Sequence, residues 1–298
     1  EISKQKADKL IGADAVILGI ETSCDETSAA VVRSGRNILS NVISTQIDIH
    51  RKYGGVVPEI ASRKHVETVD LIIDEALAAA DITFEDIDAV AVTCGPGLVG
   101  ALLVGIAAAK AIAYSYNLPL VGVNHIEGHI CSALLAYHEL EPPFLSLVVS
   151  GGHTMVVEVQ DYCKYHILSK SRDDAAGEAF DKVGRLFGLP YPGGPEVDRL
   201  AKTGNASAVS FPLAYLRDGD MSFSGLKTAV INYLNSAQNA KREINAADVA
   251  AAFQQSVVSS LLDALAAAIR ATGINKVALV GGVSANNALR EGVLKLAA

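Results

Sequence analysis

The sequence of 298 residues lacks the patterns that mark several classes of protein. No C-x-x-C pair occurs among its four cysteines, Cys24, Cys94, Cys131 and Cys163, which favours a reducing compartment over a disulfide framework or a zinc knuckle. Positive charge is also scarce, because 25 Lys and Arg face 33 Asp and Glu and leave a net charge of -8. Any nucleic-acid partner therefore needs a local basic patch or a helper subunit.

Long hydrophobic runs are missing as well. Residues 1–14 are charged and contain no apolar signal core, so we interpret them as a short N-terminal extension or leader. The most apolar run, residues 97–109, meets Lys110 after 13 residues, short of the roughly 20 that a membrane helix needs. We expect this run to be a buried Gly/Ala-rich helix of a cytoplasmic protein with no membrane partner.

The composition is that of a globular protein, with 50% hydrophobic and 19% charged residues and enough length for two domains. Residues 15–32 read as an apolar run, a polar turn and a second apolar run, which predicts a β-hairpin. Residues 143–159 repeat this pattern. We therefore predict two domains of related topology, at 15–141 and 142–298, the second with a helical insertion.

Strands and helices alternate between and after these hairpins. Apolar residues from Val66 to Leu77 recur at helical spacing, residues 89–93 read as a buried strand, and a Gly-Pro-Gly turn and another helix follow. Residues 173–188 read as a helix, and the chain ends on a strand, a glycine turn and a helix. This alternation predicts an α/β protein.

Three glycine turns follow or join apolar strands, at residues 150–154, 191–196 and 281–287. None fits a P-loop or Rossmann fingerprint, but glycine turns let backbone N–H groups approach a phosphate. Three such turns in one α/β chain favour a nucleotide held between domains over simple tight turns.

Two groups of acids are candidates for binding. Asp174, Glu178 and Asp181 have the spacing of one helix face, which indicates either a solvated acidic stripe or a site for hydroxyls or metal-bound water. Asp25 and Glu26 lie in the turn of the first hairpin, where they could hold a cation or position a transferred group, although turn acids are common for conformational reasons.

His125 and His129 are four residues apart in "HIEGH" and lie roughly 40° apart on a helix, so they can share a metal. In an H-E-x-x-H protease the glutamate directly follows the first histidine. Glu127 comes two residues later, roughly 200° from both histidines. The spacing keeps a metal pair and removes the general base, while the alternative is a histidine pair satisfied by local hydrogen bonds.

Several segments together resemble the TsaD family, the tRNA N6-adenosine threonylcarbamoyltransferases, with the bacterial and organellar branch most similar. They are "GIETSCDET", "YGGVVPEIASRKH", "GPGLVGALLVG", "HIEGH", "VSGGHT", "DDAAGEAFDKVGRLFGLPYPGGPEVDRLA", "FSGLKTAV" and "GGVSANNALR". The resemblance covers nearly the whole chain. It implies the two-domain ASKHA fold of actin, Hsp70 and sugar kinases, with a nucleotide cleft between the domains.

The resemblance also implies an activity and roles for residues. The family transfers a threonylcarbamoyl group from threonylcarbamoyl-AMP to N6 of the tRNA adenosine 3′ of the anticodon, position 37, and releases AMP. His125 and His129 resemble its metal ligands, and Asp25 and Glu26 resemble the acidic turn that faces the transferred group. The positions that resemble its adenylate- or nucleotide-binding residues are Val148, Val149, Ser150, Gly151, Gly152, Asp181, Gly194, Asp198 and Asn286.

Cofactors and partners follow from the same resemblance. It implies one divalent metal, iron or zinc with Fe²⁺ favoured, as well as ATP or ADP with Mg²⁺. The implied partners are TsaB, TsaE, tRNA, a separate synthetase for the adenylate and a second copy in a homodimer. A further Asp ligand in the family lies in a D-N-A-A-like segment after "GGVSANNALR", so we expect the 298 residues to lack this C-terminal tail.

Two other functions are considered as alternatives to the transferase. One is a metal-dependent glycoprotease, against which the position of Glu127 argues. The other is a nucleotide-dependent scaffold without chemistry of its own.

Overall fold

The structure is a computed structural model that describes residues 14–297, and the predicted extension at 1–14 lies outside this range except for Asp14. The chain divides into two compact units, Glu1–Glu139 and Leu140–Ala298, and each is described by itself.

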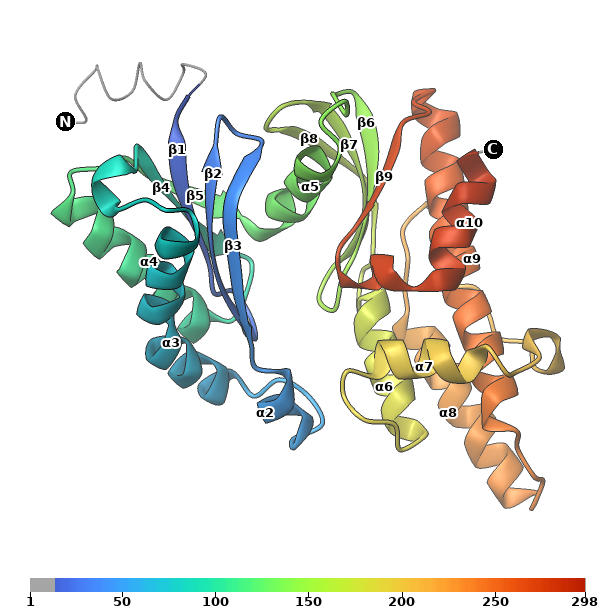
Figure 1. Cartoon of the computed structure of the whole chain (residues 1–298). Coiled ribbons are helices and arrows are strands. Elements are labelled where there is room, and N and C mark those ends of the chain that lie inside the picture. Colours follow the sequence, from blue (N-terminus) through green and yellow to red (C-terminus); the bar gives the residue numbers. More distant parts are fainter. Residues whose placement is uncertain (1–13, 298) are drawn as a thin grey trace. The chain divides into compact units, whose positions relative to one another are not determined.

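Unit 1 contains one five-stranded mixed sheet (Figure 1). Its strands are β1 (Val16–Glu21), β2 (Glu26–Arg33), β3 (Asn37–Thr45), β4 (Ala89–Gly95) and β5 (Leu120–Asn124), in the order β3-β2-β1-β4-β5. The predicted first hairpin is confirmed, since β1 pairs antiparallel with β2. Strands β1, β4 and β5 run parallel, so their carboxyl ends meet at one edge.

The helices of unit 1 are α2 (Ile47–Arg51), α3 (Pro58–Ala79), α4 (Val99–Ser115) and α5 (His125–Ala136), with the short 3₁₀ helix η1 (Phe84–Asp86). Helices α3 and α4 lie side by side on one face of the sheet (Figure 1). Their buried side chains form a core with those of Leu18, Val31 and Val90, which are fully buried.

The helix predicted from the spacing of Val66 to Leu77 is confirmed as α3, whereas the predicted burial of the run at 97–109 needs correction. The α3 position Val66 is 64% exposed, because it lies on the face of the helix that turns away from the core. The run at 97–109 is only half buried: Ala101 and Ala109 pack inward, while Val99 and Leu103 are exposed. Helix α4 is thus amphipathic by position although nearly all its residues are apolar.

Unit 2 repeats the arrangement of the first four strands. Its strands are β6 (Phe144–Val149), β7 (Thr154–Asp161), β8 (Lys164–Lys170) and β9 (Val277–Val280), in the order β8-β7-β6-β9. As in unit 1, the first strand pairs antiparallel with the second and parallel with a later strand. The second predicted hairpin and the related topology are therefore confirmed, as is the α/β class.

The helices of unit 2 are α6 (Ala176–Leu186), α7 (Gly193–Ala201), α8 (Ser224–Asn239), α9 (Ala246–Thr272) and α10 (Asn287–Ala297), with the 3₁₀ helices η2 (Ala206–Ala208) and η3 (Gly282–Ala285). Helix α9 contacts the sheet, α7 and α10. Among residues 14–297 it is the one helix long and apolar enough to cross a membrane, but 61% of its most apolar window is buried inside the protein. We therefore assign α9 as the core helix of unit 2.

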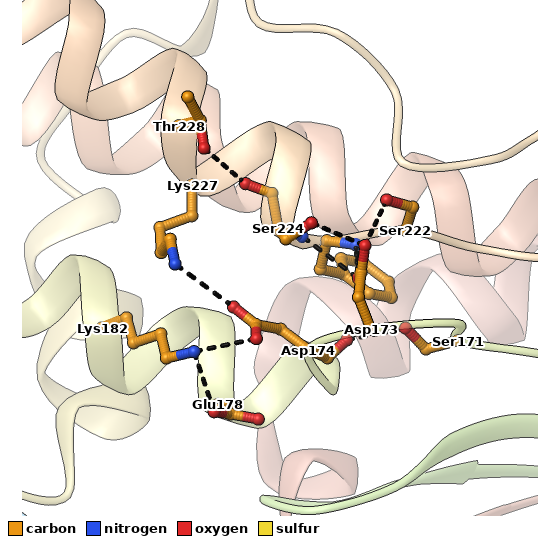
Figure 2. Close-up of polar contacts among 10 residues, drawn as sticks. Ser171, Asp173, Asp174, Glu178, Lys182, Ser222, Ser224, Lys227 and Thr228 are labelled. Atoms are coloured by element: carbon orange, nitrogen blue, oxygen red, sulfur yellow. Dashed lines mark hydrogen bonds and ion pairs between the residues drawn. The ribbon is translucent and has the colours of Figure 1, made fainter.

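The loop before α6 is fastened to the start of α8 by Asp173 (Figure 2). Its carboxylate accepts hydrogen bonds from the hydroxyls of Ser222 and Ser224, at 2.5 and 2.6 Å, and from the backbone N–H groups of Phe223 and Ser224. These N–H groups have no intrahelical acceptor, so Asp173 caps α8 from a segment about fifty residues away.

The acidic stripe of Asp174, Glu178 and Asp181 that the sequence predicts on one face of α6 is wrong. Helix α6 begins at Ala176, whose N–H donates to Thr154 Oγ1, so Asp174 precedes the helix. Lys182 Nζ lies 2.8 Å from both Asp174 and Glu178, and Lys227 Nζ lies 3.6 Å from Asp174 (Figure 2). These carboxylates are held in ion pairs, whereas Asp181 bonds to backbone N–H groups at the start of α7.

The hydrogen bonds from the start of α8 to Asp173, here called the Asp173 clamp, predict a pH-dependent contribution to stability. Burial alone would raise the pKa of Asp173, but the bonds from Ser222, Ser224 and Phe223 lower it below its ordinary value. The contribution is therefore present above about pH 3.9, the unfolded pKa, and is lost as pH falls through the folded pKa. Asp173→Ala should lower the free energy of unfolding by about 1 kcal/mol at neutral pH.

Urea unfolding of this variant at neutral pH and below about pH 4 checks the prediction, because the difference from wild type should shrink in acid. Asp263→Ala, at an exposed position of α9, controls for the loss of one negative charge. A difference that stays constant over this range would contradict the clamp.

Candidate active site

The histidine pair of unit 1 lies where three parallel strands end. Register places Ile20 of β1 beside Val92 of β4, and Thr93 beside Val123 of β5. Helix α5 begins directly after β5, with the Asn124 side chain accepting a hydrogen bond from the N–H of Ile126. The sheet therefore brings Glu21, Thr93 and His125 to one edge although they are distant in sequence.

Glu21 is the centre of a hydrogen-bond network at this edge. Its carboxylate accepts from Thr93 Oγ1 at 2.6 Å, from the N–H of Ser23, and from His125 Nδ1 at 3.2 Å. Burial alone would raise the pKa of Glu21, but the bonds from His125, Ser23 and Thr93 outweigh burial and lower this pKa to about 2. These hydrogen bonds therefore favour the ionised form of Glu21.

His125 and His129 occupy successive turns of α5, and their ring centroids are 4.5 Å apart with an interplanar angle of 70°. Both rings line a cavity of about 440 Å³ over the face of the sheet, together with Glu21, Glu26 and Thr93. Glu127 and Asp25 are not among the lining residues. The absence of Glu127 from the cavity lining agrees with helix geometry, which places it on a different face of α5 from the histidines.

Glu26 is the acid of the hairpin turn that reaches this cavity. Burial, together with the carboxylates of Asp25 and Glu21, raises the pKa of Glu26 above its ordinary range. A carboxyl group with a raised pKa holds a proton more readily than an ordinary glutamate, which is a property of groups that act in proton transfer.

Buried polar groups hold the turn in place. His65 is fully buried on α3, donates from Nε2 to the carbonyl oxygen of Cys24 at 2.9 Å, and accepts from Thr27 Oγ1 at 2.8 Å. Gly97 approaches from the other side, where an added Cβ would lie 2.5 Å from the carbonyl oxygen of Ser23. Sequence reasoning missed His65, since only the fold brings "SRKH" beneath "CDET".

The donor set of unit 1 fits part of a metal site. Two imidazoles on adjacent turns face one cavity, which is a common arrangement for a first-row transition metal. Within residues 14–297, no third His, Cys, Asp or Glu joins them in a cluster suited to a metal ion. Among the described residues, these two imidazoles are therefore the candidate metal donors of unit 1.

The three glycine turns of unit 2 converge. Gly281 follows β9 and lies beside Val149 of β6. Its φ of +90° favours glycine, and an added Cβ would lie 2.5 Å from the carbonyl oxygen of Val149, so this position requires glycine. The N–H of Gly177 on α6 donates to the carbonyl oxygen of Ser150. Asn286, at the end of the third turn, bonds to Asp198 of α7, the helix that the second turn begins.

Predicted binding residues of unit 2 meet in two hydrogen-bonded pairs. Asp181 Oδ1 accepts from the N–H groups of Gly193 and Gly194, at 2.7 and 3.3 Å. Asn286 Nδ2 donates to Asp198 Oδ1 at 3.3 Å and to Gln254 Oε1 at 2.9 Å. All three side chains of the second network belong to buried residues, each 8% exposed, and Asn287 adds a bond to Asp198 at 2.9 Å.

The remaining predicted residues differ in whether a ligand could reach their backbone groups. Val148 and Val149 are fully buried in β6, so a ligand could reach them only through the backbone. Gly151 and Gly152 are exposed, and their N–H groups have no acceptor among the described residues. The turn at 150–153 can therefore bind an anion through its backbone. Gln254 and Asn287 were missed by sequence reasoning, because nothing in a helix pattern marks which polar side chain will be buried.

Gly177→Ala should disturb this turn. An added Cβ would lie 2.5 Å from the carbonyl oxygen of Ser150 and 2.9 Å from Gly151 Cα, so backbone must move. We expect a loss of about 1–3 kcal/mol in the free energy of unfolding and weaker binding of an adenylate analogue. Gly225→Ala, also at the second residue of a helix but with open space around it, is the matched control. Equal effects of both variants on unfolding and binding would contradict this packing.

Comparison with known proteins identifies the family. Residues 37–298 match the family described as TsaD: tRNA N6-adenosine threonylcarbamoyltransferase. A protein of that name from Clostridium perfringens (strain SM101 / Type A) is 58% identical over 282 residues, which cover 94% of this chain and 83% of the relative. Another, from Clostridioides difficile (strain 630), is 56% identical over 287 residues, or 96% of this chain and 85% of the relative.

Solved structures share the fold. Full-length HypF in its phosphate- and nucleotide-bound form has a TM-score of 0.64 at 16% identity, covering 95% of this chain and 42% of that protein. Component A of (R)-2-hydroxyglutaryl-CoA dehydratase from Acidaminococcus fermentans has a TM-score of 0.53 at 16% identity, covering 94% and 88%. These similarities agree with the predicted ASKHA fold, and the sequence match shows that this chain belongs to the bacterial branch of the TsaD family of tRNA N6-adenosine threonylcarbamoyltransferases.

Proposed function

We propose that this protein transfers a threonylcarbamoyl group from threonylcarbamoyl-AMP to N6 of the adenosine 3′ of the tRNA anticodon and releases AMP. The observation that carries the proposal is the match to relatives of that name along 94% of the chain. In addition, the histidine pair and Glu26 of the hairpin line one cavity.

The residues of unit 1 would act on the acyl group. His125 and His129 would hold a divalent metal, with Fe²⁺ preferred to zinc, which supplies Lewis-acid polarisation of a carbonyl when it is bound. Glu26, with its raised pKa, is placed in the same cavity to hold or release a proton near the acyl carbon. Asp25 would contribute negative charge beside Glu26 without lining the cavity.

The residues of unit 2 would hold the adenylate part. Backbone N–H groups of Gly151 and Gly152 suit the phosphate, and Asp198 suits a ribose hydroxyl through acceptor capacity that Asn286 and Asn287 leave open. Asp181 Oδ1 already accepts from Gly193 and Gly194, so Asp181 mainly shapes the start of α7. Val148 and Val149 would support the turn from the core.

Partners belong to the same proposal. The net charge of -8 is unfavourable for a polyanion, so helper proteins such as TsaB and TsaE would assist tRNA binding, and a separate synthetase would supply the adenylate. We also propose a cytoplasmic location, where a tRNA substrate is available.

The test measures transfer of labelled threonylcarbamoyl from the adenylate to tRNA, with the helper proteins present. The same tRNA with guanosine in place of the target adenosine is the matched control, since it lacks the N6 amine. We expect label on the first tRNA only. Absence of transfer beside an active Clostridium relative would overturn the proposal.

The two rival functions are less favoured. A glycoprotease needs a general base beside the metal, and Glu127 does not line the cavity. A scaffold without chemistry would leave the cavity and the raised pKa of Glu26 without a role, and it predicts adenylate binding with no transfer.

A further inference from the structure

Glu21 lies at the proposed metal site yet has no role in the chemistry described above. We infer that Glu21 is a positioning residue that keeps the ring proton of His125 on Nδ1, so that Nε2 carries the lone pair available to a metal. The inference rests on the proposed function in one respect only, namely that this lone pair binds the metal proposed for the transfer reaction.

The hydrogen-bond geometry fixes the tautomer. His125 Nδ1 lies 3.2 Å from Glu21 Oε2 and 3.2 Å from Ser23 Oγ. A carboxylate can only accept a hydrogen bond, so Nδ1 must be the donor. In the neutral ring one nitrogen then carries the proton and the other carries the lone pair, which places the lone pair on Nε2.

Glu21 is itself held in one position, which a positioning residue requires. Its Oε1 accepts from the N–H of Ser23, and its Oε2 accepts from Thr93 Oγ1 as well as from His125. Thr93 is only 7% exposed and is fixed by its place in β4. Because Ser23 and Thr93 both hold its carboxylate, Glu21 is fixed in a position from which it accepts the hydrogen bond of His125 Nδ1.

Such an arrangement is useful for a metal that has few protein ligands. A carboxylate bonded to the far nitrogen of a metal-binding imidazole fixes the ring and raises its basicity, and removing it typically weakens metal binding about 10- to 100-fold. The two imidazoles are the candidate metal donors among the described residues, so the orientation of each counts for more.

The tautomer can be measured directly in metal-free protein. Nitrogen NMR of protein labelled with ¹⁵N-histidine, in mildly alkaline buffer, distinguishes a protonated Nδ1 from a protonated Nε2, and the His125→Ala variant assigns the signal. We expect protonation at Nδ1 in the wild type and a loss of this preference in Glu21→Ala. A wild-type His125 protonated at Nε2 would overturn the inference without any variant at Glu21.

Metal affinity gives the second measurement. Competition of the protein with a chromophoric chelator for Zn²⁺ should show binding about 10- to 100-fold weaker in Glu21→Ala, with partial recovery in Glu21→Gln, whose side-chain oxygen can still accept. Glu127→Ala is the matched control, because it removes a glutamate from the same helix as the two histidines but from a position that does not line their cavity. Unchanged Zn²⁺ affinity in Glu21→Ala would contradict the inference. If Glu21→Ala does not fold, the Glu21→Gln variant decides: unchanged Zn²⁺ affinity together with a mixture of His125 tautomers would contradict the inference.

These measurements use neither tRNA nor adenylate. A protein with the Nδ1 proton but without transfer activity would remove the proposed function and leave the inference intact. An active transferase with the proton on Nε2 would do the reverse.

Discussion

His125→Ala should lower the rate of threonylcarbamoyl transfer by about 100- to 1000-fold. Polarisation of a carbonyl by a bound metal is worth several kcal/mol in the transition state, and each 1.4 kcal/mol corresponds to about a factor of ten. If the histidine pair holds the metal as proposed, the loss of His125 leaves a single imidazole among the described residues. Single-turnover transfer to tRNA and metal content, measured on the same preparation, should therefore fall together.

The control for this prediction is His138→Ala. His138 is exposed, lies outside the cavity and contributes only its carbonyl oxygen to a bond from Arg36. It should leave rate and metal content unchanged. A His125→Ala protein with normal metal content and a normal rate would show that the histidine pair is only a local structural contact.

Phe253→Ala should lower the free energy of unfolding of unit 2 by about 3–5 kcal/mol. Phe253 is fully buried in the first third of α9 and packs edge-on against Phe180 of α6, with ring centroids 5.2 Å apart. The surrounding helices meet the sheet here, so the structure can collapse only partly into the space left behind. Because this is a large share of the stability of a typical domain, unit 2 should become marginal.

Urea unfolding followed by far-UV circular dichroism checks this, since the chain has no tryptophan for fluorescence. Leu294→Ala, at a position 70% exposed on α10, is the matched loss of apolar volume and should change the free energy of unfolding by less than about 0.5 kcal/mol. Similar midpoints for the two variants would contradict the assignment of α9 as the core helix. Phe253 neighbours Gln254, so the Phe253→Ala protein should also bind an adenylate analogue more weakly.

The fold could be predicted from sequence where periodicity decides it. Both hairpins follow from apolar runs around a polar turn, and both are confirmed. The third strand of each sheet, β3 and β8, was missed because these edge strands mix polar and apolar residues and leave Ile38 and Ile167 exposed. Edge strands are covered on fewer sides, so their hydrophobic signal is weak.

The residues of the candidate site likewise fall into those that a local pattern predicts and those that only the fold brings together. The spacing of His125 and His129 indicated a shared face, since both lie on one helix and its geometry is local. Glu21 could not be predicted, because its partners come from β4 and α5 and only parallel pairing brings them together. Asp174 was placed on a helix face wrongly, since a hydroxyl from β7 decides where α6 begins.

The two units use one hairpin plan with opposite electrostatic preferences. The first turn, residues 22–25, ends in Asp25 and leads into Glu26, and it lies beside Glu21, so it suits a cation. The second turn, residues 150–153, holds no acidic side chain and offers the N–H groups of two glycines, so it suits an anion. One duplicated element therefore carries opposite charge preferences in the two units, and the few residues of the turn decide which preference each unit has.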